Sequence, residues 1–295
     1  MIIGWGEFFA LASALTWSVA VILLRRPACE LPAFELNLFK IVLAFLLFVP
    51  TVGLIEGVSL PGYSLAELGT LLLSGFIGIA VADTWYLRAL NLMGASRTGI
   101  IASLLSPFVI VLSVLFLGES LGGWQLIGFA LVMAGILLVT WRRRRSEIDA
   151  EHVRKGILFG IGSVFLMALG VVMVKGILET RPFLWSVELR LLGGLLGMLA
   201  YLLARGRISS VLKGYSRSLP WVHIIIGSFL GAYVSMLMWL AGYKLIDASV
   251  ASILNESANA WIVLLAWLIL GEPLNARKVI GLLMTMVGVG VMLLV

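Results

Sequence analysis

Long apolar runs follow one another along almost the whole chain, and this feature limits the possible folds most strongly. A helix needs about 20 mainly apolar residues to cross the hydrocarbon core of a bilayer. The runs do not alternate polar and apolar residues as the strands of a membrane barrel do. The sequence therefore predicts an all-α integral membrane protein with ten transmembrane helices. These cover roughly residues 5–24, 34–54, 66–92, 95–117, 122–141, 156–175, 183–204, 219–245, 248–270 and 276–295.

The composition agrees with a protein inserted in a lipid bilayer. Of the 295 residues, 61% are hydrophobic and 12% are charged, whereas soluble domains are about 45–50% apolar and about 25% charged. The net charge of +6 reflects basic loops, so we expect no nucleic-acid partner. Cys29 is the single cysteine, and His152 and His223 lie far apart, so we expect no metal and no other cofactor. The start lacks a basic n-region, which predicts a retained first helix.

The second half of the chain repeats the first half 153 positions later. The segment ASRTGIIASLLSPFVIVLSVLFLGESL (95–121) aligns with ASVASILNESANAWIVLLAWLILGEPL (248–274), and Glu119 falls on Glu272. Glycines and acidic residues that recur together indicate a duplication rather than a shared apolar composition. Further pairs at the same shift are Gly118 and Gly271, Gly128 and Gly281, Gly135 and Gly288, and Glu35 and Glu188.

The duplication divides the chain into three parts. We expect a first five-helix repeat at 1–141, a basic cytoplasmic linker at 142–155 and a second five-helix repeat at 156–295. Because five is an odd number, the second repeat must lie inverted in the membrane. Inverted repeats recur in secondary transporters, whose substrate site lies near the bilayer midplane at the repeat interface.

The distribution of basic residues predicts the orientation. The loops that follow odd-numbered helices hold most of the 21 Lys and Arg residues. The opposite loops hold only Lys175, Arg181 and Lys244, while Lys40 and Arg190 lie within spans. Cytoplasmic loops carry an excess of Lys and Arg. We therefore expect a multi-pass protein of the plasma (inner) membrane with its odd-numbered loops in the cytoplasm and both termini outside.

Three segments carry a resemblance to a known family. They are SLLSPFVIVLSVLFLGESL (103–121), GFALVMAGILLV (128–139) and WLILGEPLNARKVIGLLMTMVGVGVML (267–293). With ten helices in a five-plus-five repeat, the chain resembles the EamA-type drug/metabolite transporter superfamily. Arg190 falls where that family often has an arginine early in its seventh helix. The resemblance implies a transporter whose fourth and ninth helices border a central substrate cavity. It also implies cytoplasmic termini, which the charges here contradict.

A polar stripe lies within the ninth apolar run, in ASILNESANAW (251–261). Its members are spaced i, i+3, i+4 and i+7, which places them on one face of an α-helix. The equivalent stripe in the first half is small or polar and includes Ser103 and Ser106. The two stripes are therefore expected to line one substrate-binding cavity. The stripe consists of Ser252, Asn255, Glu256 and Asn259.

Glu256 is the strongest candidate for a functional residue. It follows Ala248 by eight residues, which places it about 12 Å along the helix. A carboxylate at that depth usually faces a polar cavity, binds a substrate or relays protons. The alternative is a protonated Glu256 that stabilises helix packing. Asn255 and Asn259 fit either substrate binding or helix joining, because amides also connect membrane helices.

A second acidic residue, Asp83, lies well inside the third run with Tyr86 on the same face. It is a further candidate for substrate binding or proton coupling, unless an arginine such as Arg190 neutralises it. The residues at equivalent positions of the second half include Tyr233 and Trp239. These aromatic residues and Trp17 could stack a ligand or bind a cation, although packing explains most membrane tryptophans.

Other acidic residues have simpler explanations. Glu119 and Glu272 end helices beside turn residues, so their repetition favours an architectural role over gating. Glu35 and Glu188 lie near span starts, where a carboxylate complements the helix dipole. Arg190 could pair with Glu188 or with an acid across the bundle.

The sequence thus predicts a secondary transporter, not an enzyme, that moves a small organic metabolite, amine or amino acid by alternating access. No nucleotide-binding motif appears, so a proton or substrate gradient is the expected energy source. Export is the direction that the resemblance favours. The alternative is a lipid or polyprenyl-phosphate flippase, which would need Arg190, Lys40 and Lys175 in one membrane-facing cleft. Substrate identity and oligomeric state are not encoded in any recognisable motif.

Overall fold

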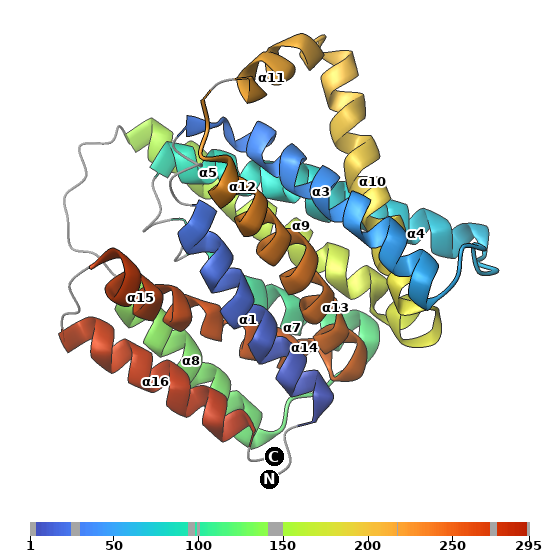
Figure 1. Cartoon of the computed structure of the whole chain (residues 1–295). Coiled ribbons are helices and arrows are strands. Elements are labelled where there is room, and N and C mark those ends of the chain that lie inside the picture. Colours follow the sequence, from blue (N-terminus) through green and yellow to red (C-terminus); the bar gives the residue numbers. More distant parts are fainter. Residues whose placement is uncertain are drawn as a thin grey trace.

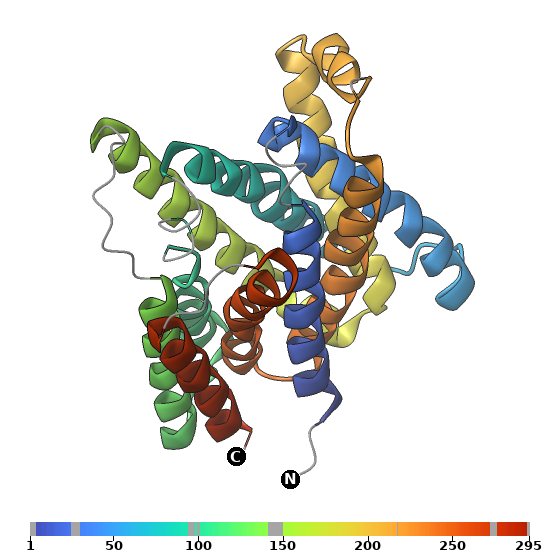
Figure 2. The same cartoon turned by 60° about the vertical axis from the view of Figure 1, so that its left-hand side comes forward.

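A computed structural model describes most of the chain as a bundle of helices, and its described part contains no strand (Figure 1). The first residues of α1 and the last residues of α16 lie at the same end of the bundle (Figures 1 and 2). The described residues are 4–24, 30–93, 98, 101–140, 150–216, 218–271 and 276–293.

The helices follow the apolar runs closely. The first half contains α1 (Trp5–Leu24), α3 (Ala33–Ile55), α4 (Leu65–Gly75), η1 (Phe76–Val81), α5 (Ala82–Met93), α7 (Leu105–Leu117) and α8 (Gly123–Thr140). The second half contains α9 (Ala150–Thr180), α10 (Phe183–Ala204), α11 (Ile208–Tyr215), α12 (Trp221–Ser228), η2 (Phe229–Val234), α13 (Ser235–Leu245), α14 (Ala248–Asn255), α15 (Ser257–Leu270) and α16 (Ala276–Met292).

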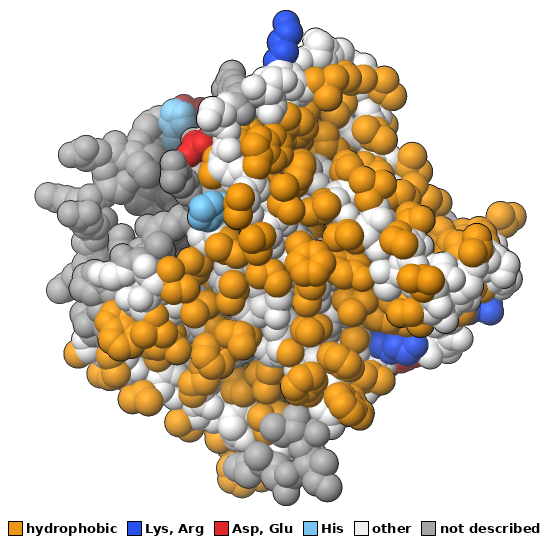
Figure 3. Space-filling view, viewed as in Figure 1, with side chains coloured by type: hydrophobic (Ala, Val, Ile, Leu, Met, Phe, Trp, Pro, Cys, Tyr) orange, Lys and Arg blue, Asp and Glu red, His pale blue; other side chains and the backbone are white. Residues whose placement is uncertain are grey.

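Seven of these helical stretches are long and apolar enough to cross a membrane. Two of them contain a π-helical segment, since η1 joins α4 to α5 and η2 joins α12 to α13. The described parts of α7 and α8 form shorter apolar helices. Hydrophobic side chains cover much of the face seen in Figure 3, as a surface in contact with lipid requires.

Local sequence signals explain several helix ends. Ser64 caps α4 through a reciprocal pair of hydrogen bonds with Glu67, which satisfies amides that the first turn leaves free. Gly118 and Gly271 end α7 and α15 with φ of 69° and 65°, a conformation that glycine adopts without the usual cost of a side chain. The helix α9 begins at Ala150, so residues 150–155 of the predicted linker are helical.

Close packing through glycine joins α8 to α16. A Cβ atom at Gly135 would lie 2.6 Å from the carbonyl oxygen of Gly281, and one at Gly288 would lie 2.7 Å from that of Gly128. The residue numbers rise along one helix as they fall along the other, so the two helices are antiparallel. Small residues permit this close approach in membrane helices. Helix α1 packs against α12–α13 and against α14–α15.

Candidate functional site

The candidate site is centred on an interruption in the ninth predicted span. Helix α14 ends at Asn255 and α15 begins at Ser257. The amide of Glu256 donates to two carbonyl oxygens, those of Ser252 at 3.2 Å and Ile253 at 3.1 Å. The polar stripe predicted for one uninterrupted helix is therefore divided at Glu256.

The carboxylate of Glu256 is buried and fixed by neighbouring side chains. Ser106 Oγ on α7 lies 3.0 Å from Glu256 Oε1 and also 3.0 Å from the carbonyl oxygen of Ser252. Asn259 Nδ2 donates to Glu256 Oε2 at 2.9 Å. Glu256 is 6% exposed. It therefore connects α7 to the start of α15, and its oxygens already have donors.

Asn255 faces a different neighbour. Its Nδ2 donates to Ser13 Oγ at 2.6 Å and to the carbonyl oxygen of Ala10 at 3.3 Å, both on α1. Adjacent residues of a helix point about 100° apart, so Asn255 and Glu256 contact different helices. Ser252 Oγ donates locally to the carbonyl oxygen of Ser249. The amide of Asn255 thus joins helices, which was one of the two readings that the sequence allowed.

Four ionisable side chains from different helices lie inside the bundle, and we call them the charged centre. Asp83 on α5 is half-buried and interacts electrostatically with Lys40 on α3 and with Arg190 on α10. Tyr86, one turn beyond Asp83, interacts electrostatically with both Asp83 and Glu256. The charged centre consists of Lys40, Asp83, Arg190 and Glu256.

Two of the predicted aromatic residues lie against the cations of the charged centre. Lys40 Nζ lies 5.4 Å from the ring centre of Trp17, and Arg190 Cζ lies 5.5 Å from that of Trp239. Cation–π contacts of this kind stabilise a positive charge that has lost water. Tyr233 is placed differently, because its hydroxyl lies 2.7 Å from Thr51 Oγ1 and its ring packs on Phe48.

The sequence reasoning missed one residue of this region and underrated two. Tyr243 is fully buried and interacts electrostatically with Glu256 and Arg190. Its position four residues after Trp239 was the available signal, since such residues share a helix face. Arg190 was expected to pair with an acid such as Asp83 or Glu188, and Lys40 and Arg190 were considered for the flippase alternative; neither was predicted as a site residue. Ser103 is buried in the turn that precedes α7.

The segment η1 makes room for the guanidinium group of Arg190. A Cβ atom at Gly78 would lie 3.1 Å from Arg190 Nη2, and one at Gly75 would clash with the carbonyl group of Arg190. The α10 backbone therefore passes very close to the junction of α4 and η1. Single π-helical turns inside α-helices often occur at functional sites, and here the turn lies beside the charged centre.

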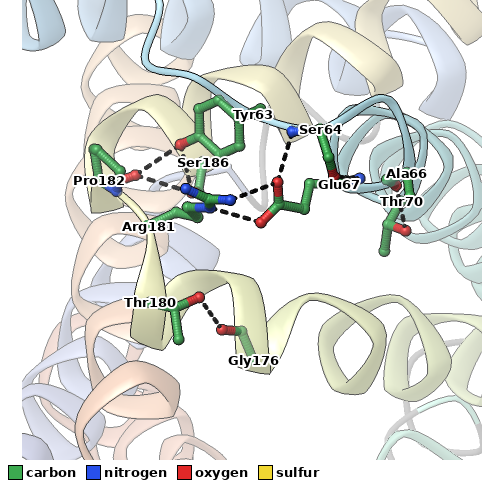
Figure 4. A network of polar contacts seen from close by, with 10 residues as sticks. All are labelled: Tyr63, Ser64, Ala66, Glu67, Thr70, Gly176, Thr180, Arg181, Pro182 and Ser186. Carbon is green, nitrogen blue, oxygen red and sulfur yellow. Dashed lines mark hydrogen bonds and ion pairs between the residues drawn. The ribbon is translucent and has the colours of Figure 1, made fainter.

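Polar contacts tie two loops together at one end of the bundle, and we call them the clasp (Figure 4). The carboxylate of Glu67 accepts hydrogen bonds from Arg181 Nε at 2.6 Å and Nη2 at 2.9 Å. This contact raises the pKa of Arg181. The hydroxyl of Tyr63 donates to the carbonyl oxygen of Pro182 at 3.1 Å and lies 2.9 Å from Ser186 Oγ. The clasp links the start of α4 to the turn between α9 and α10.

Two further carboxylates cap helices across the chain. Glu56 accepts from the amides of Leu184 and Trp185 at 3.0 and 2.9 Å. Glu119 accepts from the amides of Ala248 and Ser249 at 2.8 and 2.9 Å, and from Ser249 Oγ at 2.7 Å. These hydrogen bonds hold the start of α14, as the predicted architectural role of Glu119 requires, and they are equally compatible with the gating alternative. Its predicted repeat partner, Glu272, lies outside the described residues.

This arrangement of buried charges within a membrane bundle agrees with a comparison of sequences. The sequence model described as the EamA-like transporter family matches residues 4–141 and 154–294. The chain belongs to this family. The resemblance inferred from its motifs is thereby confirmed, and the EamA-like protein is a multi-pass membrane protein.

Individual relatives are distant. An uncharacterized transporter of Clostridium kluyveri is 23% identical over 223 residues, which is 75% of this chain and 71% of the relative. The UDP-N-acetylglucosamine transporter of Rattus norvegicus is 25% identical over 134 residues, which is 42% of this chain. The match spans only 41% of that rat protein.

A solved structure supports the fold. A crystal structure of another protein superposes on the EamA-like protein with a TM-score of 0.79 at 18% sequence identity. The superposition covers 97% of both chains. At this level of identity the likeness describes the fold alone.

Proposed function

We propose that the EamA-like protein is a secondary transporter that moves a small organic molecule by alternating access between two inverted five-helix halves. The observation that carries this proposal is the charged centre. Lys40 and Asp83 come from the first proposed half, and Arg190 and Glu256 come from the second. Buried ionisable groups in membrane proteins are costly, and they usually mark a substrate or ion pathway.

Recurring backbone features support the two halves. The π-helical segments Phe76–Val81 and Phe229–Val234 lie 153 positions apart, as do the left-handed glycines Gly118 and Gly271. The interruption at Glu256 follows the turn at Ser103 by the same interval. Four of these eight pairs of residues are identical and four differ, so the backbone conformation recurs even where the side chains do not.

The contact between α8 and α16 supports inversion. A shift of 153 converts the contact between Gly128 and Gly288 into the contact between Gly281 and Gly135. Such a pair of contacts is what a twofold axis between equivalent helices would produce. Because the two helices are antiparallel, the axis would relate halves of opposite orientation, as in inverted-repeat transporters.

The clasp and the caps support alternating access. Glu67 with Arg181, Glu56 with the start of α10, and Glu119 with the start of α14 each join the first proposed half to the second. All these contacts lie at the end where even-numbered loops meet. We propose that they close the outer face, since basic residues assign the odd-numbered loops to the cytoplasm.

The substrate is a small molecule with charged groups. The rat relative is named a UDP-N-acetylglucosamine transporter, and nucleotide sugars are charged metabolites. Export driven by a proton or substrate gradient fits the family, with Glu256 and Asp83 as the groups that would carry a proton. The flippase alternative gains no support, because Arg190 and Lys175 are only 3% and 6% exposed and do not face the membrane.

The test is uptake into proteoliposomes of metabolites, amines and amino acids, with Glu256→Gln and Asp83→Asn beside the wild type. We expect both variants to transport the identified substrate at a tenth of the wild-type rate or less, with an altered pH profile. The matched control is Glu151→Gln, which removes an exposed carboxylate paired with Lys155. Wild-type rates and pH dependence in both test variants would refute the proposed site.

A further inference from the structure

Arg190 is buried with an incomplete set of hydrogen bonds. It is 3% exposed, and its Nε donates to Ser74 Oγ at 3.0 Å. Its Nη1 has no hydrogen-bond partner. A guanidinium group carries five N–H donors, and buried donors in folded proteins are nearly always paired. An unpaired donor on a buried cation therefore calls for an explanation.

The helix that carries Arg190 does not supply its counter-charge. Glu188 is the nearest acid in sequence, but residues two positions apart lie on opposite sides of a helix. Both carboxylate oxygens of Glu188 are also buried without a hydrogen-bond partner. The pairing of Arg190 with Glu188 that the sequence left open is therefore absent.

Asp83 provides only part of the neutralisation. It interacts electrostatically with Arg190 and also with Lys40, so one carboxylate serves two cations. The other acid of the charged centre, Glu256, already accepts hydrogen bonds from Ser106 and Asn259. Among Arg190, Asp83 and Glu256, the buried atom without a hydrogen-bond partner is Nη1 of Arg190. The unmet hydrogen bond therefore belongs to a cationic donor.

A second buried donor without a partner lies near the first. The indole of Trp239 can only donate toward the hydroxyl oxygen of Tyr243, so the O–H of this tyrosine has no acceptor, and Tyr243 is 0% exposed. Tyr243 interacts electrostatically with Arg190, and both pack on Trp239, whose ring centre is 5.1 Å from that of Tyr243 and 5.5 Å from Arg190 Cζ. A cationic donor and a hydroxyl donor around one aromatic ring form a suitable cradle for an oxyanion.

We propose that Arg190 and Tyr243 bind the carboxylate or phosphate group of the transported molecule. Asp83 is the counter-charge of Arg190 in the substrate-free conformation, and the substrate oxyanion takes its place. This inference rests on the proposed transport function, which it deepens by assigning an anionic group to the substrate. The proposal therefore excludes purely cationic amines, which were among the substrates that the sequence predicted.

The test uses pairs of probes that differ by the oxyanion. Suitable pairs are succinate and succinamide, glucose 6-phosphate and glucose, and L-tryptophan and tryptamine. The thermal unfolding midpoint of the purified full-length protein is measured against probe concentration, because a bound ligand stabilises the folded state. We expect the oxyanion member of at least one pair to raise the midpoint, and its partner to leave it unchanged. The pair that responds separates carboxylate from phosphate.

The variants assign the effect to the proposed groups. Arg190→Gln should weaken binding of the responding probe about tenfold or more, since it removes a charge-assisted hydrogen bond. Tyr243→Phe should weaken binding about fivefold while keeping the ring, and it tests the site even if Arg190→Gln does not fold. Asp83→Asn should strengthen binding severalfold, because the competing carboxylate is gone. A merely structural Asp83 would not give tighter binding.

The proposal is overturned if no oxyanion probe exceeds its partner, or if Tyr243→Phe and a folded Arg190→Gln bind the responding probe as the wild type does. Its failure is distinguishable from failure of the transport function. Uptake with an unchanged KM in Arg190→Gln would refute this site and leave transport standing. Oxyanion-specific binding without uptake in proteoliposomes would refute transport and leave the site standing.

Discussion

Replacing Glu119 with alanine removes the acceptor from three donors at the start of α14. The amides of Ala248 and Ser249 would lose their partners, and these residues are 0% and 1% exposed. A buried donor left unpaired costs about 1–3 kcal/mol, so two such amides predict a loss of roughly 2–6 kcal/mol. Glu119 itself is half-buried, and water entering the space it leaves should keep the loss near the lower limit, about 2 kcal/mol.

The assay for Glu119 is reversible unfolding in mixed micelles, followed by circular dichroism as the denaturing detergent is increased. Glu119→Gln should cost about half as much as Glu119→Ala, because the amide keeps one acceptor oxygen. The control is Glu151→Ala, which removes an exposed carboxylate of the same size. A change in unfolding free energy no larger for Glu119→Ala than for this control would refute the capping argument.

Three further substitutions probe packing, the clasp and the helix contact of Asn255. Gly135→Ala should destabilise the protein by about 1–3 kcal/mol through overpacking. The control Gly290→Ala should be neutral, because its Cβ would meet nothing within 4 Å. Equal unfolding midpoints in the two variants would count against the α8–α16 contact. Glu67→Gln should cost about 1 kcal/mol or less, because the ion pair with Arg181 is still partly exposed to solvent. It should nevertheless accelerate hydrogen exchange at 181–186, and unchanged exchange would show that the clasp does not hold the two segments together. Asn255→Ala should lower the unfolding midpoint without changing the KM for transport, and a raised KM would return Asn255 to the binding site.

The sequence by itself determined the class of fold. Apolar runs of about 20 residues predict membrane helices, because lipid offers no hydrogen-bond partners to backbone N–H and C=O groups and a helix pairs these groups within itself. Seven helices meet the length and composition required, and the described parts of α7 and α8 are shorter than the runs suggested. The motifs were also sufficient to recognise the family. They contain glycines and acidic residues at fixed intervals, a pattern that apolar composition alone does not produce.

Only the tertiary structure decided which polar residues meet. Helical periodicity placed Asn255 and Glu256 on one face, but Asn255 contacts α1 and Glu256 contacts α7. Only its position four residues after Trp239 marked Tyr243, and no sequence pattern pointed to Glu56. The physical reason is that periodicity describes one helix at a time. The partner of a buried charge is set by how separate helices pack, which requires contacts between residues far apart in the chain.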